Sequence, residues 1–345
     1  MNNPINFDRK PFSRHPPPRA FPIVATKAWR GAPKPASVPG RMDVYLPIAN
    51  LAVNGLVIVG LGALTGLLSG MFGVGGGFLT TPLLIFYGVP PTVAAASAAS
   101  QVTGASVSGA LAHARRGGID YQIGAVLIAG GVIGTGIGAL LFRVLQALGQ
   151  IDTTINVLYV VMLGSIGSLM GVESFGAIRA RQTGRAQKAR RRRHHPLVAS
   201  LPLRWRFYRS GLYISPLAPL LLGIATGILT MLMGIGGGFI LVPAMLYILG
   251  MSVTVVVGTS LFQILFVTMA TTMMHALTTR AVDLVLASLL LVGSVLGAQI
   301  GALFAQKAKP DVLRLVLALI VLAVAVRMAL GLGWRPDEIY TVVGL

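Results

Sequence analysis

Two glycine-rich runs interrupt otherwise apolar stretches of the sequence, GVGGGF at 73–78 and GIGGGF at 234–239. In a lipid bilayer, backbone N–H and C=O groups need partners, so an irregular break survives only where protein buries it or where it lines a polar cavity. Such a break also presents the N-terminal N–H groups of the next helix, with about half a positive charge. The runs therefore predict an anion-binding site, whose backbone donors we assign to Gly75, Gly76, Gly77, Gly236, Gly237 and Gly238.

Four polar side chains lie well inside long apolar segments and are candidate neutral donors for the same site. Gln101 and Gln263 each sit among small and hydroxyl-bearing residues. A buried amide needs hydrogen-bond partners, which either a neighbouring helix or an oxygen of a substrate could supply. Ser100 and Ser260 lie within one turn of the glutamines and share this ambiguity, because a serine hydroxyl can also bond to a carbonyl of its own helix.

Two histidines follow the glutamines at an identical distance. His113 and His275 each come twelve residues later, about 18 Å along a helix, which places them near helix ends. They are either polar residues of a helix interface or a proton-responsive gate, since histidine titrates near neutral pH. Asp120 and Asp283 stand at the starts of the next helices, where a capping role is favoured.

The sequence also lacks residues that catalysis, cofactor binding or metal binding would need. The predicted spans carry no Lys, Arg, Asp or Glu at their centres, and the chain has no cysteine. The glycine runs lack the last glycine of a dinucleotide-binding fingerprint and the lysine of a phosphate loop. We therefore expect no enzymatic activity, no cofactor and no metal site.

The composition indicates a membrane protein. Hydrophobic residues make up 54% of the 345 residues and charged residues only 11%, against about 25% charged in soluble domains. The formal net charge of +19 is unevenly distributed, since 19 of the 28 Lys and Arg residues lie in 1–45 and 178–210. Basic segments beside membrane spans are typical of topology signals and contacts with anionic lipid headgroups. We expect no nucleic-acid binding.

The apolar segments predict an all-α polytopic fold with about eight membrane-spanning helices. Segments of about 20 residues or more can cross a bilayer core of roughly 30 Å, whereas segments half as long cannot. Two half-length segments, 78–88 and 239–249, follow the glycine runs directly. The long segments are 46–70, 91–113, 119–142, 152–172, 212–233, 252–276, 281–305 and 311–332.

The order of motifs recurs, which predicts two homologous halves. After each glycine run come a glutamine, a histidine, an aspartate and three glycines spaced four apart, a spacing typical of helix packing. Whether the halves are parallel or inverted depends on the number of crossings in each and stays open. The predicted divisions are a disordered basic tail, a first repeat, a basic connector, a second repeat and a C-terminal tail, at 1–45, 46–177, 178–210, 211–333 and 334–345.

The duplicated module resembles the TauE/SafE, or sulfite exporter, family of membrane permeases. The residues that carry the resemblance are GMFGVGGGFLTTPLLIFYG at 70–88 and GIGGGFILVPAML at 234–246, with the polar segments that follow. The resemblance implies a multispanning transporter of the bacterial inner membrane for small sulfur-containing anions such as sulfite or sulfonates. With the basic residues, it leads us to expect the N-tail and connector on the cytoplasmic side.

The sequence is compatible with three functions. The first is a secondary transporter that works by alternating access, with a small anion held at the paired glycine breaks. The others are a passive anion channel and a membrane scaffold that acts through its basic connector. The sequence does not predict the oligomeric state.

Overall fold

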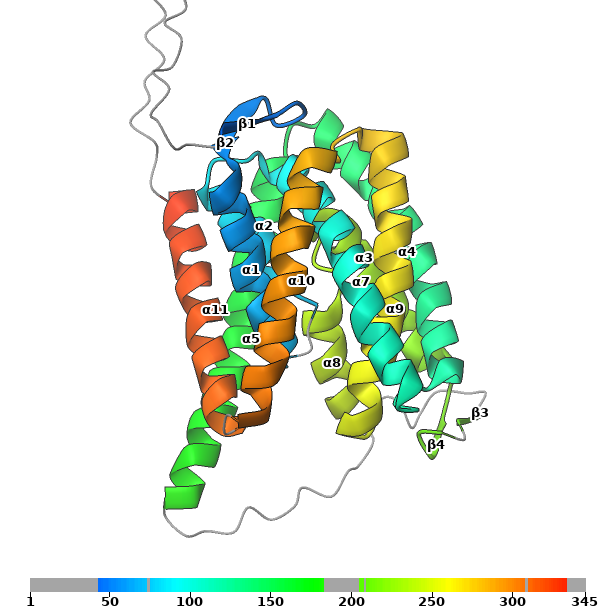
Figure 1. Cartoon of the computed structure of the whole chain (residues 1–345). Helices are drawn as coiled ribbons and strands as arrows, with labels where there is room; N and C mark the ends of the chain where they lie inside the picture. Colours follow the sequence, from blue (N-terminus) through cyan, green and yellow to red (C-terminus); the bar gives the residue numbers. More distant parts are fainter. Residues whose placement is uncertain (1–42, 73–74, 183–204, 208, 308–309, 334–345) are drawn as a thin grey trace, which may run out of the picture. The chain divides into compact units, whose positions relative to one another are not determined.

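The structure is a computed structural model that describes residues 43–72, 75–182, 205–207, 209–307 and 310–333 (Figure 1). Most of the two predicted tails and of the connector therefore lie outside the described residues. The described chain is helical apart from two short hairpins. The helices are α1 Gly55–Phe72, α2 Gly77–Phe86, α3 Pro91–Arg115, α4 Tyr121–Ala147, α5 Ile151–Gln182, α7 Leu217–Met233, α8 Gly238–Tyr247, α9 Val253–Met274, α10 Leu284–Lys307 and α11 Pro310–Gly333, with a π-helical turn, η1 His275–Thr279, after α9.

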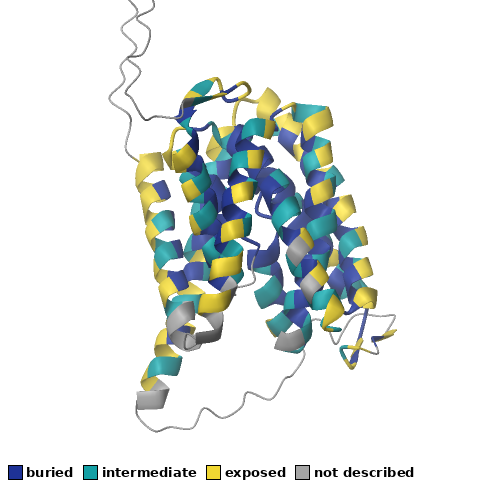
Figure 2. Cartoon of the chain, in the orientation of Figure 1, coloured by how far each residue is buried: buried dark blue, intermediate teal, exposed yellow. Residues whose placement is uncertain are grey.

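The helices make an all-α membrane fold. Within the described residues, five helical stretches are long and apolar enough to cross a bilayer, and they lie in α4, α5, α9 with η1, α10 and α11. Many large apolar side chains face outwards, such as Leu140, Val172 and Leu284, which are 65%, 74% and 76% exposed. Figure 2 shows the exposed residues on the outer faces of the helices and the buried residues between them. An apolar outer surface of this extent is suited to lipid contact.

Two predicted spans begin differently from the expectation. The first residues of 46–70 form a hairpin of β1 Asp43–Leu46 and β2 Leu51–Asn54, so the helix starts only at Gly55. The first residues of 212–233 belong to a second hairpin, β3 Trp205–Phe207 with β4 Leu212–Ile214. The cause is local, because Asn50 and Gly211 take positive φ values of 52° and 63° that turn the chain back.

Helices α1 and α10 pack side by side through glycine. A Cβ atom at Gly62 or Gly70 would overlap the backbone of Leu290 or Ala298, respectively. The residue numbers rise together along this contact, so the two helices run parallel. Three glycines of α10 face α1 in the same close way: Gly293, Gly297 and Gly301.

Helices α4 and α7 form a second parallel pair of the same kind. A Cβ atom at Gly130 would overlap the carbonyl oxygen of Leu220, and one at Gly134 would overlap that of Ile224. The prediction that the four-residue glycine spacing serves helix packing is confirmed. Each pair joins a helix from before the 178–210 connector to one from after it, so tight packing links distant parts of the chain.

Helices α3 and α9, by contrast, run antiparallel. The hydroxyl of Thr103 donates to that of Thr268 over 2.9 Å, and the hydroxyl of Ser100 donates to that of Thr272 over 3.4 Å. Residue numbers therefore rise on one helix as they fall on the other. α5 and α11 are also antiparallel (Figure 1). The aligned segments 91–113 and 252–276 thus point in opposite directions.

Each half-length helix turns back toward the start of the helix before it. The hydroxyl of Tyr87, just after α2, accepts a hydrogen bond from the backbone N–H of Asn54, just before α1. Ile58 near the start of α1 packs in one cluster with Leu84 near the end of α2. α1 and α2 therefore form a helical hairpin. α7 and α8 form another, in which Ala218 near the start of α7 packs in one cluster with Met245 near the end of α8.

The two strand hairpins lie at opposite ends of the helical bundle (Figure 1). β1–β2 packs with the starts of α3 and α10, whereas β3–β4 packs with the starts of α4 and α9. α1 and α2 together return to the end of the bundle from which α1 started, which is why the hairpin before α1 packs with the start of α3. The expected cytoplasmic location of the N-tail and connector stays a prediction.

Asp120 is the N-cap of α4, as predicted. Its carboxylate accepts hydrogen bonds from the backbone N–H groups of Gln122 and Ile123 at 3.1 and 3.2 Å, and from the N–H of Ser210 at 3.0 Å. Its own N–H donates to the hydroxyl of Thr259 on α9. The cap thus also joins α4 to α9.

Asp283 has the corresponding role at α10. Its carboxylate accepts from the N–H groups of Val285 and Leu286, both at 3.1 Å, and from that of Ile48. Its own N–H donates to the hydroxyl of Ser97 on α3 over 3.1 Å. The capping prediction therefore holds at both aspartates, and the second cap joins α10 to α3.

Candidate functional site

The two glycine breaks meet inside the bundle. The rings of Phe78 and Phe239, the first side chains after the glycines, stack with centroids 4.6 Å apart and an interplanar angle of 6°. A Cβ atom on Gly77 would come within 3.0 Å of the carbonyl oxygens of Gly234 and Ile235. The sequence predicted two separate breaks, and the fold brings their backbones into contact.

Side chains from other helices bond to the end of α7 at this contact. The carbonyl oxygen of Met233 accepts hydrogen bonds from the hydroxyl of Thr81 on α2, at 3.2 Å, and from that of Tyr159 on α5, at 2.6 Å. Both hydroxyl-bearing residues are buried. The second break is therefore held by residues of the first half of the sequence.

Glycine is required in the breaks because the backbone there is left-handed. Gly75 and Gly76 have φ values of 84° and 58°, and Gly236 and Gly237 have values of 75° and 74°. One of the predicted backbone donors already has an acceptor, since the N–H of Gly77 donates to the carbonyl of Gly75 over 2.6 Å. The start of α2 still presents the positive end of a helix dipole.

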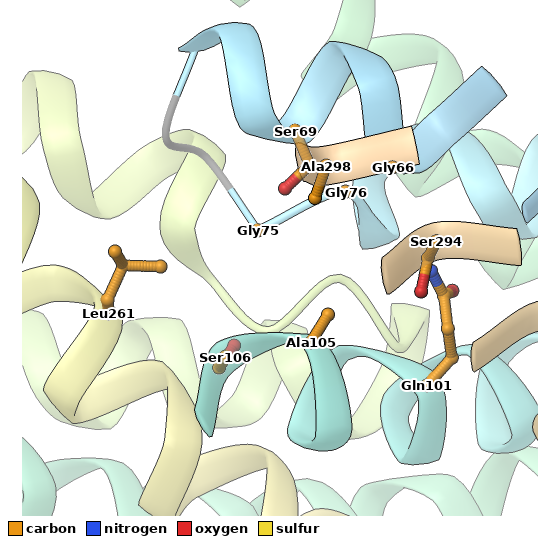
Figure 3. Close-up of a pocket in the computed structure, with 10 residues that line it drawn as sticks. All are labelled: Gly66, Ser69, Gly75, Gly76, Gln101, Ala105, Ser106, Leu261, Ser294 and Ala298. Carbon is orange, nitrogen blue, oxygen red and sulfur yellow. The ribbon is translucent and has the colours of Figure 1, made fainter. Parts of the chain in front are cut away.

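A small cavity of about 30 Å³ lies beside the first break (Figure 3). In Figure 3, Gln101 and Ser106 project from α3 on one side of this space, and Ser69 of α1 lies with the break residues on the other. All of the residues that line it are uncharged: Gly66, Ser69, Gly75, Gly76, Gln101, Ala105, Ser106, Leu261, Ser294 and Ala298.

Two polar atoms at this cavity have no hydrogen-bond partner in the structure. They are Oε1 of Gln101 and Oγ of Ser106, and both residues are 1% exposed. A buried polar atom without a partner costs free energy, so these two atoms are available to bond a bound molecule. Of the predicted site residues, the cavity brings together Gly75, Gly76 and Gln101.

The second glutamine lies elsewhere. Gln263 does not line the cavity, and its Nε2 would be 3.3 Å from a Cβ atom on Gly131 of α4. Both of its amide atoms are buried without a partner. The fold therefore places the two glutamines on opposite sides of the α3–α9 pair, one facing α10 and the other facing α4.

The two predicted serines bond to their own helices. The hydroxyl of Ser260 donates to the carbonyl of Val257 over 2.9 Å, and that of Ser100 donates to the carbonyl of Ala96 as well as to Thr272. Neither serine lines the cavity. Gly77 and Gly238 are the first residues of α2 and α8, so each directly follows the glycines with positive φ values.

Residues 58–328 match the family described as "Sulfite exporter TauE/SafE". The chain belongs to this family. Two relatives are a "Probable membrane transporter protein" of Xylella fastidiosa strain Temecula1, 28% identical, and the "Probable membrane transporter protein YjnA" of Bacillus subtilis strain 168, 24% identical. Both alignments cover 79% of this chain, and they cover 93% and 98% of the two relatives. No solved structure matches the chain.

The matched region of this TauE/SafE protein contains every predicted site residue, including the two histidines. His275 is fully buried, with Nε2 3.0 Å from the carbonyl oxygen of Met231 and Nδ1 3.1 Å from the hydroxyl of Thr279. It also packs edge-on against the ring of Phe142. His113 is only half-buried at the end of α3. The two positions therefore have different surroundings, although the sequence treats them alike.

Three serines of the TauE/SafE cavity were not predicted. Ser69 comes from α1, Ser106 from α3 and Ser294 from α10. Ser106 lies within the predicted polar helix, but several hydroxyl-bearing residues surround it there, and nothing in the sequence distinguishes it from them. Ser294 could not be found from the sequence, because only the packing of α1 against α10 brings it to the first break.

Proposed function

We propose that this TauE/SafE protein is a secondary transporter of small anions, in particular sulfur-containing oxyanions such as sulfite or organosulfonates. The observation that carries the proposal is the cavity beside the first glycine break, where Ser106 presents a buried hydroxyl, a donor for an anion, with no partner. Membership of the family supports the transport activity. The sulfur chemistry rests on the family description, because the two relatives are described only as probable transporters.

The chemistry of the cavity suits a small anion. The start of α2 contributes about half a positive charge, and the left-handed glycines let a ligand approach the backbone closely. Serine hydroxyls and the glutamine amide add neutral hydrogen bonds without a full countercharge. Gln263 and the second break, Gly236–Gly238, would form the corresponding half-site and open when the protein faces the other side of the membrane.

The proposed architecture consists of two homologous halves in inverted orientation. Each half would contribute three full-length helices and one re-entrant hairpin, α1–α2 or α7–α8. The antiparallel course of α3 and α9 supports the inversion. The glycine-packed pairs α1–α10 and α4–α7 favour two moving bodies that each combine helices of both halves, with α3 and α9 sliding or rocking past one another between them.

We predict that the two strand hairpins are exposed on opposite sides of the bacterial inner membrane. Tyr45 of β1 and Tyr213 of β4 are both 59% exposed, and the chain contains no cysteine, so Tyr45→Cys and Tyr213→Cys each introduce a single thiol. In intact cells, a membrane-impermeant maleimide should label only one of the two variants, and the other only after permeabilisation. Labelling of both variants from the same side would contradict the inverted arrangement. It would instead support the expectation that the N-tail and the connector lie on the same side of the membrane.

The transport function predicts saturable uptake or efflux of labelled sulfite in proteoliposomes, with counterflow. The double variant Gly76→Leu, Gly237→Leu should reduce this transport at least about tenfold, because each leucine would be strained at a positive φ and would meet Ser69 or Thr226. Gly164→Leu on α5, where a Cβ meets nothing within 4 Å, is the matched control.

Three results would redirect the proposal. A folded double variant that transports at the wild-type rate would contradict the site. Sulfite flux without saturation or counterflow would favour a passive channel. Loss of function on deletion of residues 180–195, with no sulfite flux in the intact protein, would favour a scaffold.

A further inference from the structure

We infer that the cavity beside the first break is a binding site for singly charged oxyanions, in which Gln101 and Ser106 contact the ligand directly and the neutral lining rejects dianions. The inference rests on the proposed transport function and deepens it, because it names the charge state of the substrate and adds Ser106 to the site.

The partnerless atoms define what the ligand must offer. Oε1 of Gln101 is an acceptor and needs a donor, whereas the hydroxyl of Ser106 can both donate and accept. Hydrogensulfite carries acceptor oxygens and one proton, so it can satisfy both atoms, whereas a sulfonate anion has no proton to donate and, of the two, can bond only to the Ser106 hydroxyl. A ligand that satisfies them also removes the free-energy cost of their burial.

The charge of the site matches one negative charge better than two. The cavity lining contains only Gly, Ala, Ser, Leu and Gln residues, and so no full positive charge. The α2 N-terminus supplies about half a charge. Each further negative charge that is taken out of water without a countercharge is costly. Sulfite as a dianion, or sulfate, would therefore be bound more weakly than hydrogensulfite or a sulfonate.

Beside the second break the hydroxyl groups at the corresponding positions are bonded, whereas the amide of Gln263, which matches Gln101, has no partner. Thr268, which matches Ser106 in the repeat, donates to the carbonyl of Ile264 over 2.8 Å and accepts from Thr103. Thr135, which matches Ala298, donates to the carbonyl of Gly131 over 2.9 Å. Of the two matching hydroxyl groups, only that of Ser106 is free to bond a ligand, which makes Ser106 rather than Thr268 the residue to test.

The experiment measures binding of sulfite and of methanesulfonate to the purified full-length protein by titration calorimetry, at pH values about one unit below and above the second ionisation of sulfite. The affinity expressed against total sulfite should fall about fivefold to tenfold from the lower to the higher pH, following the hydrogensulfite fraction. The affinity for methanesulfonate, which stays a monoanion, should not change. Sulfate should not compete.

Variants test the residues. Ser106→Ala should weaken sulfite binding about tenfold, which corresponds to about 1.4 kcal/mol. Gln101→Glu keeps the shape of the side chain but replaces the amide with a carboxyl group, which loses the Nε2 donor and, when ionised, repels an anion. It should weaken sulfite binding at least about tenfold, and it would decide the question if Ser106→Ala failed to fold. Ser165→Ala on α5 is the matched control, because that hydroxyl bonds to the carbonyl of Met162 and does not line the cavity.

The outcomes separate this inference from the proposed function. Wild-type affinity in both Ser106→Ala and Gln101→Glu, or tighter binding of the dianion, would overturn the proposed site. If the wild-type protein still transported sulfite with saturation, the proposed transport function would be unaffected. Absence of both binding and transport of any sulfur oxyanion by the wild-type protein would overturn the two together.

Discussion

Replacement of Gly134 by alanine is expected to destabilise the protein by about 1–3 kcal/mol or more, whereas the same change at Gly136, two residues along α4, should be neutral or stabilising. A Cβ atom at Gly134 would overlap the carbonyl oxygen of Ile224 on α7, and a backbone cannot rotate away as a side chain can. A Cβ atom at Gly136 meets nothing within 4 Å, and alanine favours the helix over glycine by about 1 kcal/mol.

Thermal unfolding of the purified variants in detergent, with size-exclusion profiles, measures this difference. Gly297→Ala on α10 should behave like Gly134→Ala, because its Cβ would overlap the carbonyl oxygen of Ala63 on α1. Equal melting temperatures for Gly134→Ala and Gly136→Ala would show that α4 and α7 do not pack this closely. Such a result would also remove the main support for the two bodies that combine the halves.

A cross-link between α3 and α9 is expected to stop transport. The hydroxyls of Thr103 and Thr268 are 2.9 Å apart, so cysteines at these two positions can be joined directly or by a short bifunctional reagent. The chain has no other cysteine to compete. Since α3 and α9 are proposed to move past one another, joining them should reduce sulfite flux in proteoliposomes to the level of empty liposomes. A thiol reductant should restore the flux after disulfide formation.

The control for this experiment is a cross-link inside one proposed body. Tyr121 of α4 and Phe262 of α9 have ring centroids 5.5 Å apart, and α4 also bonds to α9 through Asp120 and Thr259. The pair Tyr121→Cys, Phe262→Cys, joined by a short bifunctional reagent, should therefore transport after cross-linking as it does before. Full activity of the oxidised Thr103–Thr268 pair, with cross-linking verified by mass spectrometry, would mean that transport does not need movement between α3 and α9.

Much of the fold was predictable because it depends on local properties of the chain. Long apolar runs identify membrane helices whatever they pack against, and glycine clusters such as 73–77 break a helix wherever it lies. The four-residue glycine spacing also indicated close packing, and an aspartate at a helix start indicated a cap. Even here the tertiary context intervened, since the turns at Asn50 and Gly211 convert the starts of two predicted spans into strand hairpins.

Direction and pairing were decided only by the tertiary structure. A hydrophobic segment reads the same in either direction across a bilayer, so the sequence left the relative orientation of the halves open. The course of the described helices depends on the return of α2 along α1, which makes the two one helical hairpin. Likewise, the glycine spacing indicated that α10 packs closely against another helix, but it did not identify that helix as α1.

The candidate site shows the same division. The sequence alone identified the family, the two breaks and Gln101, since each is a matter of residue type and spacing. Only the structure shows that Gln101 lines the cavity and Gln263 does not, and that Ser294 lies at the same cavity. It also shows that the hydroxyls of Ser100 and Ser260 bond to carbonyls of their own helices and that His275 is buried. These properties depend on which side chains meet across helices that lie far apart in the chain, and no local pattern encodes such meetings.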